Sequence, residues 1–497
     1  MTATSTPDLS PHVAACRAAQ QEWARRPVRE RLRPVRAFRH LLAEVADELC
    51  AAVERELGRP PVEVLGGDVL PLADACRFLE READRLLKPR RVRLRSRPLW
   101  LWGQRDTIHR RPHGVVAVIG TWNYPLFLNG VQLTQALTAG NGVLWKPSEV
   151  STYSAPLLHS LLLRAGYPAE LVHLLPATRE AGAAVAEADV DHVVFTGSAA
   201  TGRKLAARLG ERLVSSTLEL SGCDAMFVLP DADVDLAARA AWFGATVNRG
   251  QTCIAVRRAF VQRAVYPAFV ESLQKQLATA GPMRLAQEGQ VRQAERLVTD
   301  AAARGGRVLT PPTGQLAPGD SPGANRVVPH VIADATPDMA VCREDCFAPL
   351  LAVLPFDEVP DALAQNEVCR YGLGSSVFTR DRRAAAEIAE HLRTGSVAVN
   401  DVVAPTAHPA TPFGGRGLSG WGVTQGPDGL LGMTVPQVVS VRGGTFRPHY
   451  GPAGDPDGPL GQLLTGLLQW CHAPTAGRRW TGLWRMLRAG RKVGQGS

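Results

Sequence analysis

The chain has 497 residues, of which 45% are hydrophobic and 21% are charged, and its 56 basic and 47 acidic side chains give a net charge of +9. This length exceeds what one ordinary hydrophobic core serves, so we expect two or three domains of a soluble globular protein. The charge excess is modest for this length, and we expect no nucleic-acid partner.

Neither export nor a membrane span is predicted. The N-terminus lacks the basic and then apolar pattern of a signal peptide, and no window holds about 18 uninterrupted apolar residues. Nine cysteines are scattered without regular spacing, which is typical of free thiols in a reducing compartment. Cys342 and Cys346 have no second pair or histidine cluster beside them, so we expect no metal site. Free thiols without a signal peptide or a membrane span lead us to expect a cytoplasmic location.

The first part of the chain predicts helices. Apolar residues recur at helical spacing over 11–58, and a second helical stretch covers about 68–87. We interpret the Arg-rich run at 84–111 as solvated surface. Residues 98–103 and those after them are interpreted as extended chain in a hairpin arm.

From Gly114 onward, short apolar runs alternate with helical stretches, which predicts right-handed βαβ units and a parallel sheet with ligands at the carboxyl ends of its strands. The first unit has strands at 115–120, 142–146, 172–175 and 192–197, with helices at 125–139, 154–165, 179–187 and 199–209, and 217–222 closes it. A second α/β unit has strands at 225–229, 259–262 and 395–400, with helices at 233–247, 265–279 and 290–304. A surface loop is predicted at 311–324 and a linker at 446–458.

Three side chains in distinctive local contexts indicate thioester chemistry. Cys253 follows a Gly-Gln-Thr turn, Glu219 lies 34 residues earlier in Thr-Leu-Glu-Leu-Ser-Gly, and Asn123 lies in Thr-Trp-Asn-Tyr-Pro. A thiol, a carboxylate and an amide are the parts needed to form and then hydrolyse a thioester. Each residue also has a structural interpretation. Cys253 would be an inert buried thiol, Glu219 a charge at the end of a strand, and Asn123 a turn former ahead of Pro125.

These motifs resemble the aldehyde dehydrogenase superfamily, most closely its class 3-like branch acting on long-chain and aromatic aldehydes. Later motifs fall in the family's order, so the resemblance covers about 110–425: Tyr371-Gly372-Leu373, Val399-Asn400-Asp401, Pro412-Phe413-Gly414-Gly415 and Ser419-Gly420-Trp421-Gly422. The resemblance implies an α/β fold with a Rossmann-like NAD-binding domain, a second α/β catalytic domain and a small β oligomerisation arm. We expect these at 1–95 with 114–221, at 222–400, and at 96–113 with 401–445, followed by a linker and basic tail at 446–497.

The resemblance also implies the roles of the three side chains. Cys253 would attack the aldehyde carbon, and the amide of Asn123 with the Cys253 N–H would hold the resulting oxyanion. Loss of hydride to a nicotinamide would leave a thioester, and Glu219 would deprotonate the water that hydrolyses it. Burial between Leu218 and Leu220 would raise the pKa of Glu219 towards neutrality.

By the same resemblance, the cofactor is NAD, with NADP as the alternative. Lys146 and Glu149 would bind the adenosine ribose, Asp345 the nicotinamide ribose, and the Phe-Thr-Gly-Ser turn the pyrophosphate. The full set implied is Trp122, Lys146, Ser148, Glu149, Gly197, Ser198, Gly202, Asp345 and Phe347. We expect Trp122, Tyr124, Trp242 and Phe243 to line the substrate tunnel.

Three residues depart from the family pattern. Asp345 replaces a Glu and is one methylene shorter, so it would hold the ribose more loosely. Ser221 replaces a Gly, and its side chain would crowd the approach of the cofactor. Cys223 replaces Lys and is either a small apolar filler or a resolving partner for Cys253.

The tail at 459–493 predicts a basic amphipathic helix. Trp480, Leu483, Trp484 and Leu487 recur at helical spacing among arginines, and a leucine stripe from Leu460 extends the pattern. The helix would either lie on an anionic membrane surface, which suits a long-chain aldehyde, or pack on the protein or a neighbouring subunit. Family likeness implies a homodimer.

Two further functions stay open. A relative that passes the thioester to CoA would not need Glu219 as a base for water. A catalytically weakened, membrane-associated homologue would explain the three departures, although Cys253, Glu219 and Asn123 occur together.

Overall fold

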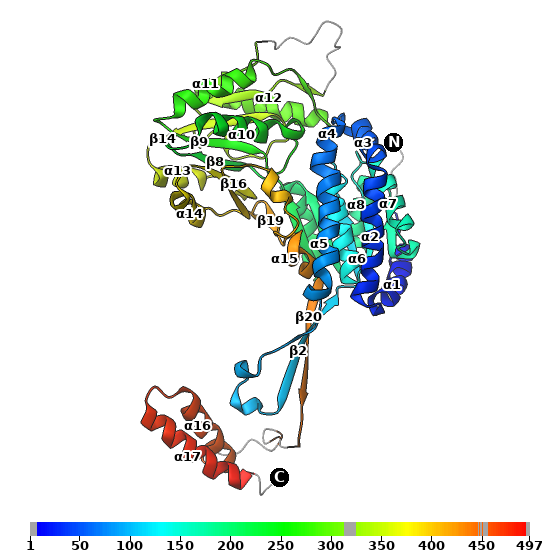
Figure 1. The fold of residues 1–497 in the computed structure, drawn as a ribbon, viewed down its shortest axis with the longest axis vertical. Coiled ribbons are helices and arrows are strands. Elements are labelled where there is room, and N and C mark those ends of the chain that lie inside the picture. Colours follow the sequence, from blue (N-terminus) through cyan, green and yellow to red (C-terminus); the bar gives the residue numbers. More distant parts are fainter. Residues whose placement is uncertain (1–6, 313–324, 446, 448–449, 451–455, 494–497) are drawn as a thin grey trace. The chain divides into compact units, whose positions relative to one another are not determined.

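The computed structural model describes residues 7–312, 325–445, 447, 450 and 456–493, so most of the predicted loop at 311–324 and linker at 446–458 lies outside the described residues. The chain divides into two compact units (Figure 1). Unit 1 comprises residues 1–87 and 111–435, and unit 2 comprises 88–110 and 436–497. The four-part domain division stays a prediction. In the described residues, no helix has the length and apolar character needed to cross a membrane.

Unit 1 contains a six-stranded sheet in the order β19-β7-β6-β3-β4-β5, in which only β19 runs antiparallel to its neighbour. Its core strands are short apolar runs, because a parallel strand is buried on both faces. The strands are β3 (Val115–Ile119), β4 (Gly142–Lys146), β5 (Val172–Leu174), β6 (His192–Gly197), β7 (Ser215–Leu220) and β19 (Gly420–Trp421). The connecting helices are α6 (Phe127–Ala139), α7 (Ser154–Arg164), α8 (Arg179–Glu187) and α9 (Ala199–Glu211).

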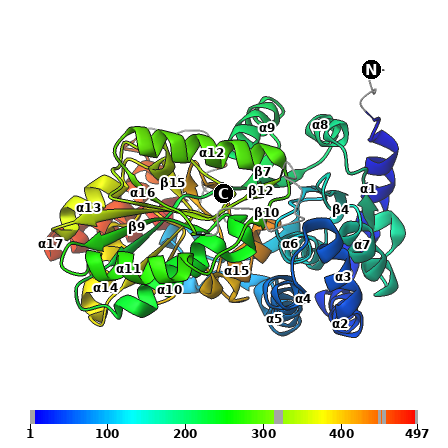
Figure 2. The ribbon, with the colours of Figure 1, turned by 90° about the horizontal axis from the view of Figure 1, so that it is seen from above.

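Alternate residues of β3 enter two different hydrophobic cores, one on each face of this sheet. Val116 and Val118 pack with α6, α7 and most of the N-terminal helices, whereas Val115 and Ala117 pack with α8, α9 and the start of the first N-terminal helix (Figure 2). The N-terminal helices are α1 (Ser10–Arg25), α2 (Val28–Glu44), α3 (Ala46–Leu57), α4 (Pro61–Val64) and α5 (Leu70–Leu86), with a π-helical turn at Leu65–Val69. The predicted α/β class with parallel sheets is confirmed.

The second sheet of unit 1 has seven strands in the order β11-β13-β14-β9-β8-β16-β17, in which only β11 runs antiparallel to its neighbour. They are β8 (Asp224–Val228), β9 (Val256–Gln262), β11 (Arg307–Leu309), β13 (His330–Ala333), β14 (Leu350–Phe356), β16 (Gly374–Phe378) and β17 (Ser396–Val399). Its helices are α10 (Val234–Thr246), α11 (Tyr266–Leu277), α12 (Glu288–Ala303), α13 (Val359–Asn366) and α14 (Arg382–His391). Short pairs join β10 (Met283–Arg284) to β12 (Arg326–Val327) and β15 (Tyr371–Gly372) to β18 (Arg416–Gly417), and α15 (Gly426–Gly432) follows β19.

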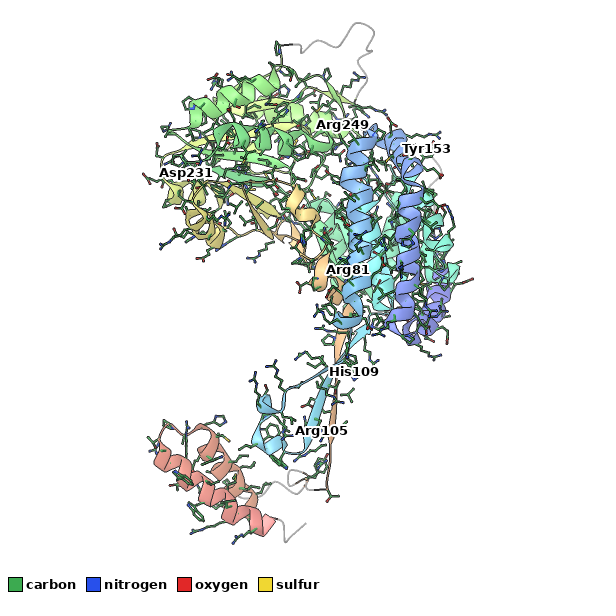
Figure 3. All side chains as sticks on the ribbon, viewed as in Figure 1. Arg81, Arg105, His109, Tyr153, Asp231 and Arg249 are labelled. Atoms are coloured by element: carbon green, nitrogen blue, oxygen red, sulfur yellow. The ribbon has the colours of Figure 1, made fainter. Side chains whose placement is uncertain are left out.

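Unit 2 contains a three-stranded sheet in the order β1-β2-β20 and a helical hairpin. The strands are β1 (Arg90–Arg91), β2 (Gln104–Pro112) and β20 (Thr434–Arg442), and Arg105 and His109 lie along β2 (Figure 3). Residues 98–103 are not wholly extended as predicted, because Leu99–Leu101 form one 3₁₀ turn after Pro98. The tail is two helices rather than one, α16 (Pro459–His472) and α17 (Ala476–Val493), since Pro474 cannot continue a helix.

The strand order of the first sheet reverses between β3 and β6, which are adjacent in the sheet but separated in the chain by β4 and β5. Ligands of open α/β sheets bind at the carboxyl ends of the strands at such a reversal. The segment from Thr121 to Asn123 follows β3, and Ser198 follows β6. The topology therefore brings two of the predicted motifs to one edge of the sheet.

Candidate functional site

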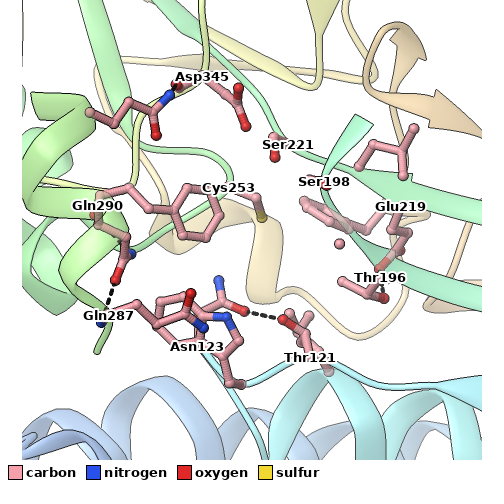
Figure 4. Close-up of a pocket in the computed structure, with 17 residues that line it drawn as sticks. Thr121, Asn123, Thr196, Ser198, Glu219, Ser221, Cys253, Gln287, Gln290 and Asp345 are labelled. Carbon is pink, nitrogen blue, oxygen red and sulfur yellow. Dashed lines mark hydrogen bonds between the residues drawn. The ribbon is translucent and has the colours of Figure 1, made fainter. Parts of the chain in front are cut away.

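A cavity of about 210 Å³ lies within unit 1 and is lined by all three predicted catalytic residues, Cys253, Glu219 and Asn123. Their side chains surround the same space (Figure 4). They come from different elements: Asn123 follows β3, Glu219 lies near the carboxyl end of β7, and Cys253 lies in the loop between α10 and β9. A thiol, a carboxyl group and an amide thus share one cavity, as the sequence predicts.

The loop that carries Cys253 is held in an unusual backbone conformation. Asn248, Arg249 and Gly250 have φ of 49°, 58° and 73°, a region that costs free energy for non-glycine residues. Gly250 is required by contact, because an added Cβ would lie 2.3 Å from the Ala348 carbonyl oxygen. The buried Arg257 guanidinium donates to the carbonyls of both Gly250 and Ala348, which fixes this loop against the segment that carries Asp345 and Phe347.

Asn123 is fixed on several sides. Its Oδ1 accepts a hydrogen bond from the Thr121 hydroxyl at 2.8 Å, and its Nδ2 donates to the Gln251 carbonyl at 3.1 Å. The Asn123 carbonyl accepts from Asn248 Nδ2 at 2.9 Å and from Arg59 at 3.3 Å. An amide nitrogen carries two hydrogens, so one remains for a ligand in the cavity.

Glu219 is buried, with 3% of its surface exposed, and it forms no ion pair with a cation of the described residues. Burial raises the pKa of the Glu219 carboxyl to about 7, although hydrogen bonds from Thr424, Thr196 and Gln132 act in the opposite direction. The last two donate to Oε2 at 3.4 and 3.3 Å. A carboxyl group with this pKa can both take and return a proton near neutrality.

The Cys253 thiol is half-buried and lines two cavities. Burial raises the pKa of the thiol to about 12, and the nearby carboxyls of Glu219 and Asp224 act in the same direction. The thiol is therefore protonated near neutral pH, and it must lose its proton to become a nucleophile.

The predicted cofactor residues divide into two groups. Trp122, Gly197, Ser198, Asp345 and Phe347 line the cavity of the catalytic residues, and the Trp122 and Phe347 rings meet edge to face at 5.9 Å. Lys146, Ser148, Glu149 and Gly202 do not line it. Lys146 and Glu149 form an ion pair at the carboxyl end of β4, and Gly202 lets α9 approach Leu220 of β7.

Sequence reasoning missed five side chains that line this cavity or contact its residues. Gln287, Gln290 and Gln293 line the cavity from one face of α12 and its N-cap, and their three-residue spacing is a signal for such a face. Gln290 donates to the Phe347 carbonyl at 3.0 Å and Gln293 to the Asp345 carbonyl at 2.8 Å. Thr424 and Gln132 had no comparable signal.

A second cavity of about 330 Å³ reaches Cys253 and is lined mainly by apolar groups, among them Tyr124, Phe127, Phe243 and Phe413. Of the four predicted tunnel residues, Tyr124 and Phe243 line it. Trp122 instead lines the first cavity, and Trp242 packs against a core of the second sheet. Arg59 is the one cation in this lining as described, and Asp68 neutralises it at 2.5 Å.

The departures from the family pattern have separate positions. Ser221 lines the cavity beside Glu219. Cys223 is buried, lines neither of these two cavities, and directs its Sγ to the Val341 carbonyl at 3.8 Å. The Asp345 carboxylate accepts from the Tyr371 hydroxyl at 3.0 Å. Among the described residues, no three His, Cys, Asp or Glu side chains group as a metal site.

Comparison with known proteins gives a consistent match over most of the chain. The model of the aldehyde dehydrogenase family matches residues 1–439. A 4,4'-diapolycopene aldehyde oxidase from Methylomonas sp. is 35% identical over 430 residues, which cover 84% of this chain and 79% of that protein. A putative succinate-semialdehyde dehydrogenase [NADP(+)] from Mycolicibacterium smegmatis is 33% identical, covering 87% and 84% of the two chains.

Solved structures agree with this match. A Mycobacterium tuberculosis aldehyde dehydrogenase complexed with NAD+ has a TM-score of 0.80 at 30% identity, covering 86% of this chain and 88% of its own. A putative aldehyde dehydrogenase from Burkholderia cenocepacia has a TM-score of 0.82 at 30% identity, covering 88% and 93%.

Proposed function

Because the chain belongs to the aldehyde dehydrogenase family, we propose that it oxidises a long-chain or aromatic aldehyde to the carboxylic acid, with Cys253 as nucleophile and Glu219 as base. One observation carries this proposal: a single cavity is lined by a thiol, a buried carboxyl with a pKa of about 7, and a fixed amide. The apolar second cavity meets it at Cys253.

The first step falls to Cys253 and Asn123. Once the Cys253 thiol has released its proton to solvent, the thiolate adds to the aldehyde carbon, and the oxygen of the tetrahedral product gains negative charge. The free hydrogen of the Asn123 amide and the Cys253 N–H would donate to this oxygen. Since Asn123 is already fixed by Thr121 and Gln251, it needs little reorganisation when the charge develops.

Glu219 would serve the hydrolysis of the thioester. Its carboxylate takes a proton from a water molecule, which then attacks the thioester carbon and releases the acid. With a pKa of about 7, the group is partly ionised near neutral pH and is a stronger base than an exposed glutamate. This role favours release of a free acid over transfer of the acyl group to CoA, which needs no base for water.

The residues present fit a nicotinamide dinucleotide. Ser198 caps the N-terminus of α9, where free N–H groups suit a pyrophosphate, and Gly197 beside it lines the cavity. Asp345 and Phe347 would hold the nicotinamide end near Cys253, and Lys146 with Glu149 the adenosine ribose. When bound, the cofactor supplies the hydride acceptor. We propose NAD, with NADP as the alternative.

The apolar cavity supports an uncharged substrate chain. Its aromatic and aliphatic lining favours a substrate that leaves water readily. A substrate carboxylate would find only Arg59, whose charge Asp68 already neutralises, and would meet the carboxylate of Glu63 in the same lining. The cavity therefore favours a long-chain or aromatic aldehyde over a short semialdehyde that bears a carboxylate.

Two strand edges support a homodimer. β20 and β17 are the last strands of their sheets, and exposed valines lie on both, with Val441 63% and Val399 44% exposed. Such edges pair readily with another chain. A cytoplasmic location completes the proposal.

A panel assay tests the activity. Purified protein with NAD and decanal, benzaldehyde or succinic semialdehyde should form NADH without added CoA, fastest with the two apolar aldehydes. A strict requirement for CoA would favour the acyl-transferring alternative. Absence of turnover with every aldehyde and both cofactors would favour the catalytically weakened homologue.

A further inference from the structure

The net positive charge of the chain comes from unit 2. This unit carries sixteen of the 56 Lys and Arg side chains and three of the 47 Asp and Glu side chains, which gives it a formal charge of +13. The remaining residues, which form unit 1, therefore carry −4. Such charge asymmetry between two parts of one chain points to an anionic partner for the basic part.

Glycines allow the two helices of the hairpin in unit 2 to pack with their backbones in contact. A Cβ added to Gly482 of α17 would lie 2.6 Å from the Trp470 nitrogen of α16, and one added to Gly466 of α16 would lie 2.5 Å from the Met486 nitrogen. The two backbones thus touch directly, and Ala489 is buried on the same side of α17.

The face of α17 opposite its backbone contact with α16 is apolar and exposed, although the Trp480 ring also meets the Trp470 ring of α16 edge to face at 6.0 Å. Trp480, Trp484 and Leu487 are 58%, 60% and 49% exposed and recur at i, i+4 and i+7, with Arg491 completing the row. This row lies on the opposite side of the helix from Gly482 and Ala489. Leu483, which the sequence pattern grouped with the tryptophans, is half-buried and does not belong to this face.

Cations flank this face without acidic partners. No Asp or Glu occurs between residues 458 and 493, and Arg488 and Arg491 are exposed and form no ion pair with any described residue. Tryptophans with arginines on one helix face are typical of a helix that lies in the headgroup region of a membrane.

The Arg-rich segment 88–110 has the same character. It contributes eight of the unit's cations and one acidic residue, and Leu94, Trp100 and Trp102 are 61%, 60% and 72% exposed. A merely solvated surface, as interpreted from the sequence, would not need two exposed tryptophans. The segment therefore adds both charge and apolar surface to unit 2.

We propose that unit 2 binds the surface of a membrane rich in anionic lipid, with the outer face of α17 inserted at the headgroup level and segment 88–110 adding attraction. The exposed Leu487 and tryptophan rings favour lipid over nucleic acid, whose backbone offers no apolar layer to receive an aliphatic side chain. Membrane binding would give the enzyme access to an aldehyde dissolved in lipid, and only this reason for the binding rests on the proposed function.

The test uses the full-length protein and vesicles, without cofactor or aldehyde, so its outcome is independent of the enzymatic proposal. Flotation should recover the protein with vesicles of phosphatidylcholine and phosphatidylglycerol, but not with phosphatidylcholine alone. Trp480→Ser/Trp484→Ser should abolish recovery, and Arg488→Gln/Arg491→Gln should weaken binding about 30-fold. High salt should weaken it as well.

A matched control lies on the other helix of the same hairpin. Leu464 and Leu468 of α16 are 53% and 62% exposed, so Leu464→Ser/Leu468→Ser removes two equally exposed apolar side chains from the same hairpin without changing α17. This variant should float like the wild type, and circular dichroism should show that both double variants keep their helices. The proposal would be overturned if both double variants lost flotation equally, or if the wild type bound neutral and anionic vesicles equally well. It would also be overturned if the protein bound RNA more tightly than vesicles, or if light scattering showed that the hairpin only joins two copies of the chain.

Discussion

The hydroxyl of Thr424 donates a hydrogen bond to the carboxylate of Glu219, across 205 residues of chain. The contact depends on β19, which brings the C-terminal part of unit 1 back to β7 and pairs Gly420 with Glu219. Gly420 has φ of 98°, and an added Cβ would lie 2.0 Å from the Leu218 carbonyl. The proposed base is therefore tuned by a segment remote from its own motif.

Replacing Thr424 with Val should raise the pKa of Glu219 further. The hydrogen bond lowers the pKa by stabilising the carboxylate, so its loss should move the value from about 7 upward by about one unit. Since the base works ionised, kcat at pH 7 should fall several-fold and recover above pH 8. The pH profile of kcat measures this, and Thr424→Ser, which keeps the hydroxyl, should retain the wild-type profile. A profile unchanged by Thr424→Val would remove this residue from the account.

The Cys253 thiol should react slowly with alkylating agents at neutral pH. Its pKa of about 12 leaves little thiolate, so the rate with iodoacetamide should rise about tenfold per pH unit between pH 7 and 10. Added NAD, whose nicotinamide ring is cationic, should increase the rate at pH 7. Peptide mass spectrometry follows the reaction, with Cys471→Ser removing the half-buried thiol of the tail as a background. A rate independent of pH over this range would contradict the environment described for Cys253.

The buried pair of Arg59 and Asp68 should matter for stability. Asp68 also accepts hydrogen bonds from the N–H groups of Leu126 and Phe127 at 3.1 and 3.0 Å. Asp68→Ala would leave the buried Arg59 cation without its carboxylate partner, which costs about 3–5 kcal/mol. We expect a large fall in Tm, and a smaller fall for the double variant Arg59→Met/Asp68→Ala. Equal falls in both variants would show that the unpaired charge is not the cause.

Narrowing the apolar cavity should change substrate preference by length. Ala407 lines it, so Ala407→Trp should raise KM for decanal about tenfold or more and leave KM for propanal nearly unchanged. Ala389 of α14 lines neither cavity, and Ala389→Trp is the matched control. If KM rises equally for both aldehydes, the cavity is not the path of the substrate chain.

Local motifs were enough to select the three side chains that share the cavity, whereas the long-range contacts around them have no local pattern. The contexts of Cys253, Glu219 and Asn123 are each contained in a few residues, and the alternation of apolar runs and helices predicted the parallel strands of the first sheet but only β8, β9 and β17 of the second. Thr424 and Gln132 reach Glu219 only because strands meet in the fold, and no local pattern marks them. The tail failed for another reason: the leucine stripe was followed through Pro474, which ends α16 and turns the predicted helix into a hairpin.

The most direct test of the central claim is the fate of the thioester in Glu219→Gln. Without a base to deprotonate water, this variant should release about one equivalent of NADH per site with decanal and then stop. Intact-protein mass spectrometry should show one added decanoyl group, located on Cys253. Continued turnover at the wild-type rate with unmodified Cys253 would contradict the assignment of Glu219 as the base and of Cys253 as the carrier of the acyl group.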